Sequence, residues 1–90
     1  KNKLKKINYN FIDSRYIKYI YLSNSKIEYI EPLAFYNLQK LESIDLKFNF
    51  IRKIELKTFK NLYNLKRLDL SDNRIESIDS FSFIDLTQLT

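Results

Sequence analysis

The chain has 90 residues and a formal net charge of +5, and it contains no glycine, cysteine or histidine. These absences exclude disulfides, a cysteine nucleophile, histidine-based metal binding or proton transfer, and glycine-rich phosphate loops. No apolar run is long enough to cross a membrane. We therefore expect at most one small domain that is not an enzyme and requires neither a cofactor nor a metal.

From residue 17 onward the sequence repeats with a period of 24 residues. The period divides the chain into three units, 17–40, 41–64 and 65–88, and Leu89 opens a fourth. Six positions of the unit are apolar every time: position 4 (Ile20, Ile44, Leu68), 6 (Leu22, Leu46, Leu70), 11 (Ile27, Ile51, Ile75), 14 (Ile30, Ile54, Ile78), 19 (Phe35, Phe59, Phe83) and 22 (Leu38, Leu62, Leu86). One unit cannot bury this set alone, whereas stacked units bury it against their neighbours.

Residues 1–16 fit the period poorly. Leu4 and Ile7 have the spacing of positions 11 and 14, whereas Phe11 falls on position 19 when the period is extended backwards. The two alignments differ by one residue. We interpret this segment as a partial, irregular repeat that covers the open edge of the first strand, or as the end of a preceding repeat in a longer array.

The same segment carries a basic tail. Lys1, Lys3, Lys5 and Lys6 supply most of the net positive charge, and the rest of the chain is nearly balanced. Such a tail can contact polyanions or anionic lipid, but a solvated terminus is the simpler interpretation. Because the body of the chain has no basic excess, we expect no nucleic-acid partner.

Each unit then opens with a predicted short strand. Apolar positions 4 and 6 alternate with a polar or exposed position 5, which predicts strands around residues 20–22, 44–46 and 68–70 with one buried face. Strands at the same position of stacked units pair in parallel at about 4.8 Å. The positions that point outward beside these strands are Lys18, Tyr19, Tyr21, Ser23 and Asn24, then Glu42, Ser43, Asp45, Lys47 and Phe48, then Lys66, Arg67, Asp69, Ser71 and Asp72.

A turn follows each strand at position 9, where the units have Ser25, Asn49 and Asn73. An amide both donates and accepts, so Asn49 and Asn73 can satisfy backbone groups at the strand ends and form a ladder along the stack. The Ser25 hydroxyl can make only part of these bonds, so the ladder should begin weakly. The absence of glycine favours wide turns, because glycine is the usual residue at positive φ.

The return half of each unit is predicted to be irregular. Positions 11 and 14 point inward from it, and the rings of Phe35, Phe59 and Phe83 fill the wide side of each unit. The third unit is followed only by the start of a fourth, so we expect an open, uncapped end that invites self-association.

The pattern L-x-x-L-x-L-x-x-N-x-I-x-x-I-x-x-x-x-F-x-x-L resembles the leucine-rich repeat, and more narrowly its 24-residue typical subfamily. That subfamily is familiar from the ectodomains of Toll-like receptors, Slit proteins and small leucine-rich proteoglycans. The resemblance implies an α/β repeat solenoid: a right-handed superhelix with short parallel strands on the concave face and irregular or 3-10 segments on the convex face. It also implies a protein ligand and, by analogy alone, an extracellular or membrane-anchored setting.

Six residues of the outward set are candidate partner contacts. The aromatic ones occupy positions that do not belong to the inward apolar set, so packing of the core does not require an aromatic residue there. Aromatic side chains of this kind can anchor an interface. Asp45 and Asp69 share position 5 on adjacent strands, where a charge-paired, solvated ladder is a better interpretation than an acid–base pair. The candidate set is Tyr19, Tyr21, Asp45, Phe48, Arg67 and Asp69.

Two functions compete. The first is a non-enzymatic module that recognises another protein through the concave face. The second is a structural or assembly segment of a longer repeat protein that stacks through its open ends and has no ligand of its own. The structural residues in either case are Asn49, Asn73, Phe35, Phe59 and Phe83.

Overall fold

The computed structural model describes residues 6–7, 16–36, 38–83 and 85–86. The described residues form seven short strands and no helix. The strands are β1 (Lys6–Ile7), β2 (Tyr19–Tyr21), β3 (Tyr29–Ile30), β4 (Ser43–Asp45), β5 (Lys53–Ile54), β6 (Arg67–Asp69) and β7 (Ser77–Ile78). All of the strand pairs are parallel, so the prediction of short parallel strands is confirmed.

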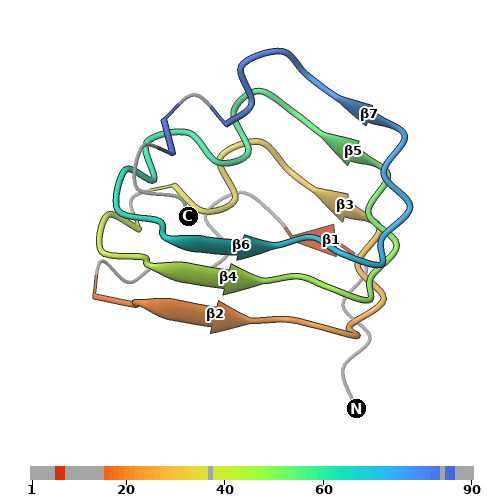
Figure 1. The fold of residues 1–90 in the computed structure, drawn as a ribbon, viewed down its shortest axis with the longest axis horizontal. Helices are drawn as coiled ribbons and strands as arrows, with labels where there is room; N and C mark the ends of the chain where they lie inside the picture. The colour runs from red at the N-terminus through yellow and green to blue at the C-terminus, as the bar shows by residue number, and fades with distance from the viewer. Residues whose placement is uncertain (1–5, 8–15, 37, 84, 87–90) are drawn as a thin grey trace.

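The central sheet has the order β2–β4–β6, and its three strands lie side by side in Figure 1. Ile20 pairs with Ile44, and Ile44 pairs with Leu68, so each residue faces its equivalent in the next unit. The ladder continues past the strand ends, where the Leu22 N–H donates to the Asp45 carbonyl at 2.8 Å. Because side chains alternate along a strand, this register places every position-4 residue on the core side.

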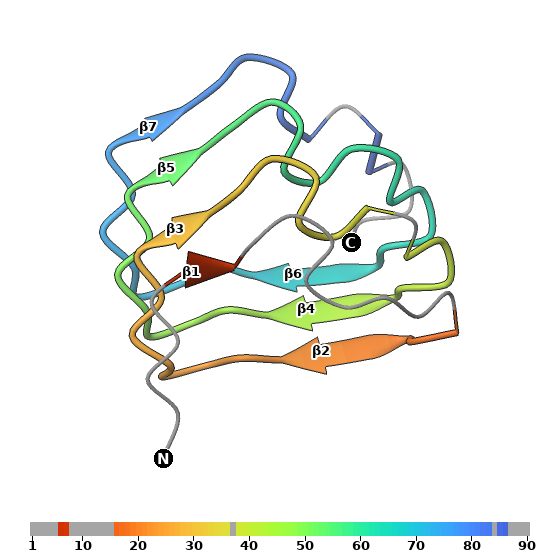
Figure 2. The same cartoon turned by 180° about the vertical axis from the view of Figure 1, so that it is seen from behind.

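The return half of the units is more regular than expected. It forms β3, β5 and β7, which run side by side on the other edge of the molecule, with β1 beside β3 (Figure 2). Ile54 pairs with Ile78, the next inward residue of the same column. The central sheet sets the spacing between neighbouring units. The returning backbones therefore also lie at hydrogen-bonding distance, and two residues per unit are enough to form such a strand.

The first strand resolves part of the ambiguity in residues 1–16. Ile7 pairs with Ile30, and this register is one residue short of the 24-residue period. It agrees with the alignment that gives Ile7 position 14. Leu4 and Phe11 lie outside the described residues, as do Lys1, Lys3 and Lys5. Lys6 does not behave as part of a free tail, because its Nζ lies 3.2 Å from Glu31 Oε2.

The core lies between the central sheet and the return strands. It buries Ile20, Ile27, Ile30, Ala34, Phe35, Leu38, Leu41, Ile44, Leu46, Ile51, Ile54, Phe59, Leu62, Leu65 and Leu86. Phe59 stacks against Phe35 at 6.1 Å between ring centroids and against Phe83 at 6.0 Å. The position-19 rings therefore form a continuous column through all three units, which is a favourable offset arrangement for aromatic side chains.

Left-handed backbone conformations occur without glycine. Seven of the described residues adopt positive φ, including Asn24, Phe48 and Asp72 at position 8 of successive units. Asparagine and aspartate tolerate the left-handed region better than other residues with a Cβ, whereas phenylalanine does not. Positive φ does not depend on glycine here, because the N–H groups of Asn24 and Phe48 donate to the carbonyls of Lys47 and Ser71 in the next unit and hold these two bends. The expectation of wide turns stays a prediction.

The third unit is less buried than the others. Ile78, predicted to point inward, is 53% exposed, whereas its equivalents Ile30 and Ile54 are fully buried. Phe83 and Leu70 are only partly buried. The reason is geometric, because each unit is covered by the next one and no described segment lies over the outer side of β7.

Candidate binding face of the three-stranded sheet

The outer face of the central sheet carries the side chains that alternate with the core residues. β2 contributes Tyr19 and Tyr21, β4 contributes Asp45, and β6 contributes Arg67 and Asp69. The register puts Tyr21, Asp45 and Asp69 in one row across the sheet. Five of the six candidate residues are therefore on strands of one sheet, and Phe48 lies three residues beyond the end of β4. We call this surface, including Phe48, the sheet face.

Two exposed tyrosines form the aromatic part of β2. Tyr19 is 54% exposed and Tyr21 is 70% exposed. Their rings are nearly parallel, with an interplanar angle of 10° and centroids 6.4 Å apart. Mutual stacking restricts both rings, so less side-chain entropy would be lost if a partner contacted them.

Phe48 is exposed and has an unfavourable backbone conformation. It is 52% exposed, its φ is 57°, and the Lys47 ammonium lies 6.0 Å from its ring centroid. Its N–H donates to the Ser71 carbonyl at 3.1 Å, which holds the bend in place. A large residue in the left-handed region costs free energy, and such strain is concentrated at functional sites.

The two carboxylates of the sheet face accept hydrogen bonds from residues two positions further along the chain. Asp45 Oδ1 accepts the Lys47 N–H at 3.1 Å, and Asp69 Oδ1 accepts the Ser71 N–H and hydroxyl at 3.0 and 2.6 Å. The Ser71 hydroxyl and then its N–H, helped by the charges of Lys47 and Arg67, lower the pKa of Asp69 below its usual value. Because both carboxylates accept N–H groups of their own unit, the arrangement fits a structural role.

A shallow hollow of about 310 Å³ lies over β4. Its lining is Tyr19, Tyr21, Ser43, Ile44, Asp45, Lys47, Arg67 and Asp69. Ser43 was predicted to be exposed, and this was wrong, since it is buried between its strand partners Tyr19 and Arg67. A small residue on the middle strand between two large ones produces a depression with an aromatic wall on one side and a charged wall on the other.

The asparagines at position 9 brace the end of this sheet. Asn49 Nδ2 donates to the Leu46 carbonyl in its own unit and to the Leu22 carbonyl in the preceding one, each at 2.9 Å. Asn73 Nδ2 repeats this pattern with the carbonyls of Leu70 and Leu46. Each amide therefore bridges two backbones, so that the ladder runs from amide to backbone and not from amide to amide. Ser25 takes part through its N–H, which donates to Asn49 Oδ1 at 3.0 Å.

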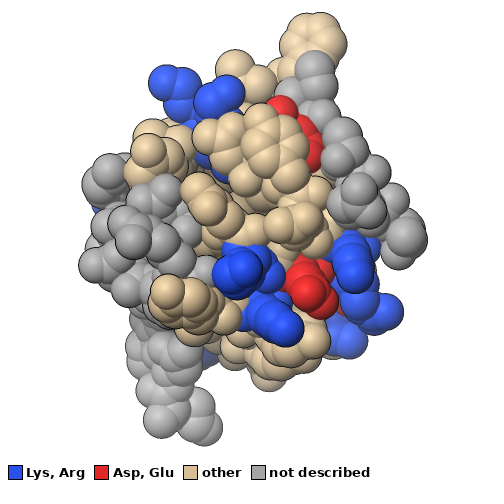
Figure 3. All heavy atoms as spheres, turned by 90° about the vertical axis from the view of Figure 1, so that its left-hand side faces the viewer, with Lys and Arg blue, Asp and Glu red and all other residues tan. Residues whose placement is uncertain are grey.

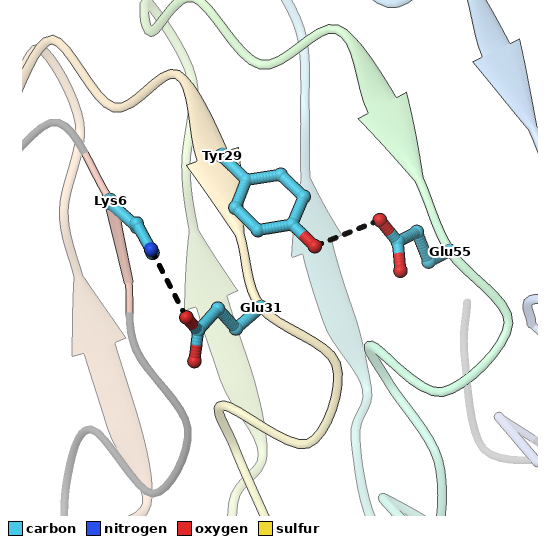
Figure 4. A network of polar contacts seen from close by, with 4 residues as sticks. All are labelled: Lys6, Tyr29, Glu31 and Glu55. Atoms are coloured by element: carbon cyan, nitrogen blue, oxygen red, sulfur yellow. Dashed lines mark hydrogen bonds and ion pairs between the residues drawn. The ribbon is translucent and has the colours of Figure 1, made fainter.

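A second polar cluster lies on the return strands. The Tyr29 hydroxyl donates to Glu55 Oε2 at 3.0 Å, beside the ion pair of Lys6 and Glu31 (Figure 4). Burial, followed by the hydrogen bond to Glu55, raises the pKa of Tyr29. These contacts join β1 to the first unit and the first unit to the second. The side chains of this cluster therefore act as structural links between units.

Basic residues gather at the edge where β2, β4 and β6 begin. A hollow of about 320 Å³ there is lined by Lys18, Lys40, Glu42, Asn64 and Lys66. Figure 3 views this side of the molecule and shows blue side chains grouped around a red one. The sequence did not single out Lys40, because position 24 of the unit has no apolar pattern and its neighbours come from other units. We call these five residues the basic corner.

A sequence profile of the family described as leucine rich repeat matches residues 39–90, more than half of the chain. The chain belongs to the leucine-rich repeat family. Among curated proteins, none matches its sequence. Leucine-rich repeats generally mediate protein–protein interaction and are typically not enzymes.

The described part of this leucine-rich repeat protein contains no group of acidic side chains arranged to hold a metal ion. Within the same residues, no helix is long and apolar enough to span a membrane.

Proposed function

We propose that this leucine-rich repeat protein is a binding module that recognises another protein through its sheet face. The observation that carries the proposal is the pair of stacked tyrosines, Tyr19 and Tyr21, which line the hollow of the sheet face, together with the ring of Phe48 beyond the end of β4; each of the three side chains is more than half exposed. None of the three contributes to the buried core. Aromatic residues are enriched among the side chains that dominate protein interfaces.

The proposal includes the shape of the array. Residues 17–40, 41–64 and 65–88 are successive turns of a right-handed superhelix whose concave side is the sheet face, and residues 1–16 are an irregular preceding turn. Support comes from the parallel pairing of equivalent residues and from the family match over residues 39–90. A concave surface increases the area that a partner can contact, which is how repeat proteins commonly bind.

The test uses a displayed library of random peptides selected on the immobilised chain. Selected peptides are then measured against the double variant Tyr19→Ala/Tyr21→Ala. The matched control is Tyr63→Ala/Phe81→Ala, because these rings lie outside the sheet face. Their exposed fractions, 52% and 72%, are similar to those of Tyr19 and Tyr21. Binding that is lost in the first variant and retained in the second supports the proposal. Equal binding by both variants contradicts it.

A second function is favoured by the exposure of the third unit. Ile78 is exposed, and Leu68, Leu70, Ile75 and Phe83 are only partly buried. β6 and β7 also have a free edge among the described residues. A structural segment that stacks through this end would self-associate without a ligand. Sedimentation over a range of concentrations, with Ile78→Lys as the disrupting variant, distinguishes the two functions.

A further inference from the structure

We propose that the partner of the sheet face carries a cluster of carboxylates, and that these dock at the basic corner while its apolar residues contact the tyrosines and Phe48. This inference rests on the proposed function and adds the chemistry of the ligand. It is carried by the position of the basic corner, by its charge, and by its continuity with the sheet face.

The backbone fixes the geometry of the corner. The Glu42 N–H donates to the Lys18 carbonyl at 2.8 Å, and the Lys66 N–H donates to the Glu42 carbonyl at 2.8 Å. Lys18, Glu42 and Lys66 therefore occupy the same position on neighbouring backbones, about 4.8 Å apart. Asn64 Nδ2 donates to the carbonyl of Gln39, the residue before Lys40, at 2.9 Å. The backbone that carries the side chains of the basic corner is therefore held by hydrogen bonds.

The charge of the corner is unbalanced. Lys18, Lys40 and Lys66 are exposed, whereas the single carboxylate, Glu42, is partly buried. The ion pairs among the described residues are Lys6–Glu31 and Arg52–Glu76, so Glu42 forms none within 4.0 Å with Lys18 or Lys40. Lys18 and Lys40 line the same hollow, like charges in one hollow repel each other, and an added anion reduces this repulsion.

The corner continues into the sheet face without a break. Lys18, Glu42 and Lys66 directly precede Tyr19, Ser43 and Arg67, which line the second hollow. An extended chain covers about 3.3 Å per residue, so a peptide of about six residues laid along 42–48 reaches from the corner to Phe48. One ligand can therefore contact both regions.

The middle of the sheet face restricts where the ligand can be acidic. Asp45 and Asp69 are held in place by backbone N–H groups, and aspartate side chains are negatively charged at neutral pH. Lys47 and Arg67 line the same hollow and offset these two charges, so the middle of the sheet face has no net charge, whereas the basic corner has an excess of lysines. Carboxylates are thereby directed to the corner, while the centre favours neutral or apolar groups.

A peptide fits this arrangement better than a uniform polyanion. A sulfated polysaccharide would satisfy the lysines of the corner, but its continuing negative charge would find no net positive charge over β4 and β6. It would also leave the stacked tyrosines without an apolar partner. Segregated acidic and apolar chemistry is a property of a protein segment.

The test compares two charge-matched variants. Lys18→Gln/Lys40→Gln removes two charges from the corner, whereas Lys57→Gln/Lys60→Gln removes two exposed charges from another part of the surface. The probes are the peptides selected from the random library, and their affinities are measured at low and high salt. Circular dichroism and thermal unfolding confirm that each variant remains folded.

We expect the selected peptides to be enriched in Asp and Glu next to an apolar residue. The corner variant should weaken their binding by about tenfold and reduce its salt dependence, because two exposed ion pairs are lost. The control variant should change the affinity by less than about twofold.

Three results would overturn the inference. Equal weakening by both lysine variants would mean that only the net charge of the chain matters. Heparin that displaces the peptides and binds as tightly would assign the corner to a polyanion. Peptides that lack acidic residues but still require Tyr19 and Tyr21 would leave the proposed function standing and remove this inference alone. If no selected peptide depends on Tyr19 and Tyr21, both proposals fail.

Discussion

The second and third units have the same inward pattern but different environments. Asn49 is fully buried, and its Oδ1 accepts the N–H groups of Ser25 and Ile27, each at 3.0 Å. Asn73 is partly buried, and among the described residues its Oδ1 accepts only the Ile51 N–H. Ile54 is buried, whereas Ile78, its partner across β5 and β7, is 53% exposed.

The contribution of a side chain to stability therefore depends on its neighbours on both sides. The sequence pattern assigns Ile54 and Ile78 the same role, but only Ile54 is covered by another unit. In a stacked array stability is a sum over unit interfaces, so an inner unit contributes two interfaces and an outer one contributes fewer. Equivalent substitutions in the two units should therefore have different costs.

The largest difference is expected at the phenylalanine column. Phe59 is fully buried between the rings of Phe35 and Phe83, so Phe59→Ala should lower the free energy of unfolding by about 3–5 kcal/mol. Phe83 has one ring neighbour among the described residues and is partly exposed, so Phe83→Ala should cost about half as much. Chemical denaturation of both variants measures this ratio, and equal costs would contradict the dependence on neighbouring units.

Phe48→Ala is the control for the column. Phe48 is only eleven residues from Phe59 but lies on the sheet face in a left-handed conformation. Its replacement should change stability by less than about 0.5 kcal/mol, as for most surface substitutions. A loss comparable to that of Phe59→Ala would show that its ring supports the fold and is not held available for a partner.

The next difference concerns the asparagine bridges. Asn49→Ala leaves two buried N–H donors and the Leu22 carbonyl without their partner, and should cost about 2–3 kcal/mol. Asn73→Ala should cost about 1 kcal/mol, because Asn73 accepts fewer bonds and water can reach the groups it leaves. Ser25→Asn should be neutral or stabilising. Unfolding midpoints of the three variants decide the order, and an unchanged midpoint for Asn49→Ala would refute the bridging role.

A substitution at position 18 should act in the opposite direction. The Thr58 hydroxyl is buried and has no hydrogen-bond partner among the described residues, whereas the Ser82 hydroxyl donates to the Asp79 carbonyl at 2.5 Å. Thr58→Val keeps the shape and removes the unpaired group, so it should raise stability by about 1 kcal/mol. Ser82→Ala should lower stability by a similar amount. A destabilised Thr58→Val variant would indicate that the hydroxyl has a partner, such as a buried water.

The sequence was sufficient to predict the family, the short parallel strands and the inward columns, because a period of 24 residues constrains every unit at once. It was not sufficient for Ser43, whose burial is decided by the size of Tyr19 and Arg67 on the flanking strands. The strands β3, β5 and β7 were also missed, since two residues carry no pattern of their own. Ile78 was predicted to be buried because the pattern assigns it the role of Ile30 and Ile54, but no described segment covers its side chain.

The candidate site was predictable only in part. Alternation along the strands identified the outward residues, but the stacking of Tyr19 on Tyr21 and the positive φ of Phe48 depend on the packed backbone. Lys40 joins the basic corner because position 24 of one unit lies beside the strand starts of the next two. Proximity between residues of different units depends on how the units pack against one another, and no short stretch of the sequence indicates it.

The smallest difference between the units is expected in acid. Asp69 accepts two hydrogen bonds from Ser71, which lower its pKa in the folded chain, whereas Asp45 accepts one, from the Lys47 N–H. A carboxyl whose pKa is lower in the folded than in the unfolded chain binds fewer protons when folded. Its contribution is therefore fully present above the ordinary value of 3.8 and is lost as the pH falls through the folded value. Asp69→Asn should consequently reduce the difference between the unfolding midpoints at pH 7 and pH 3, and Asp45→Asn is the matched control. If Asp69→Asn leaves that difference unchanged, the Ser71 hydrogen bonds contribute nothing to the pH dependence of folding.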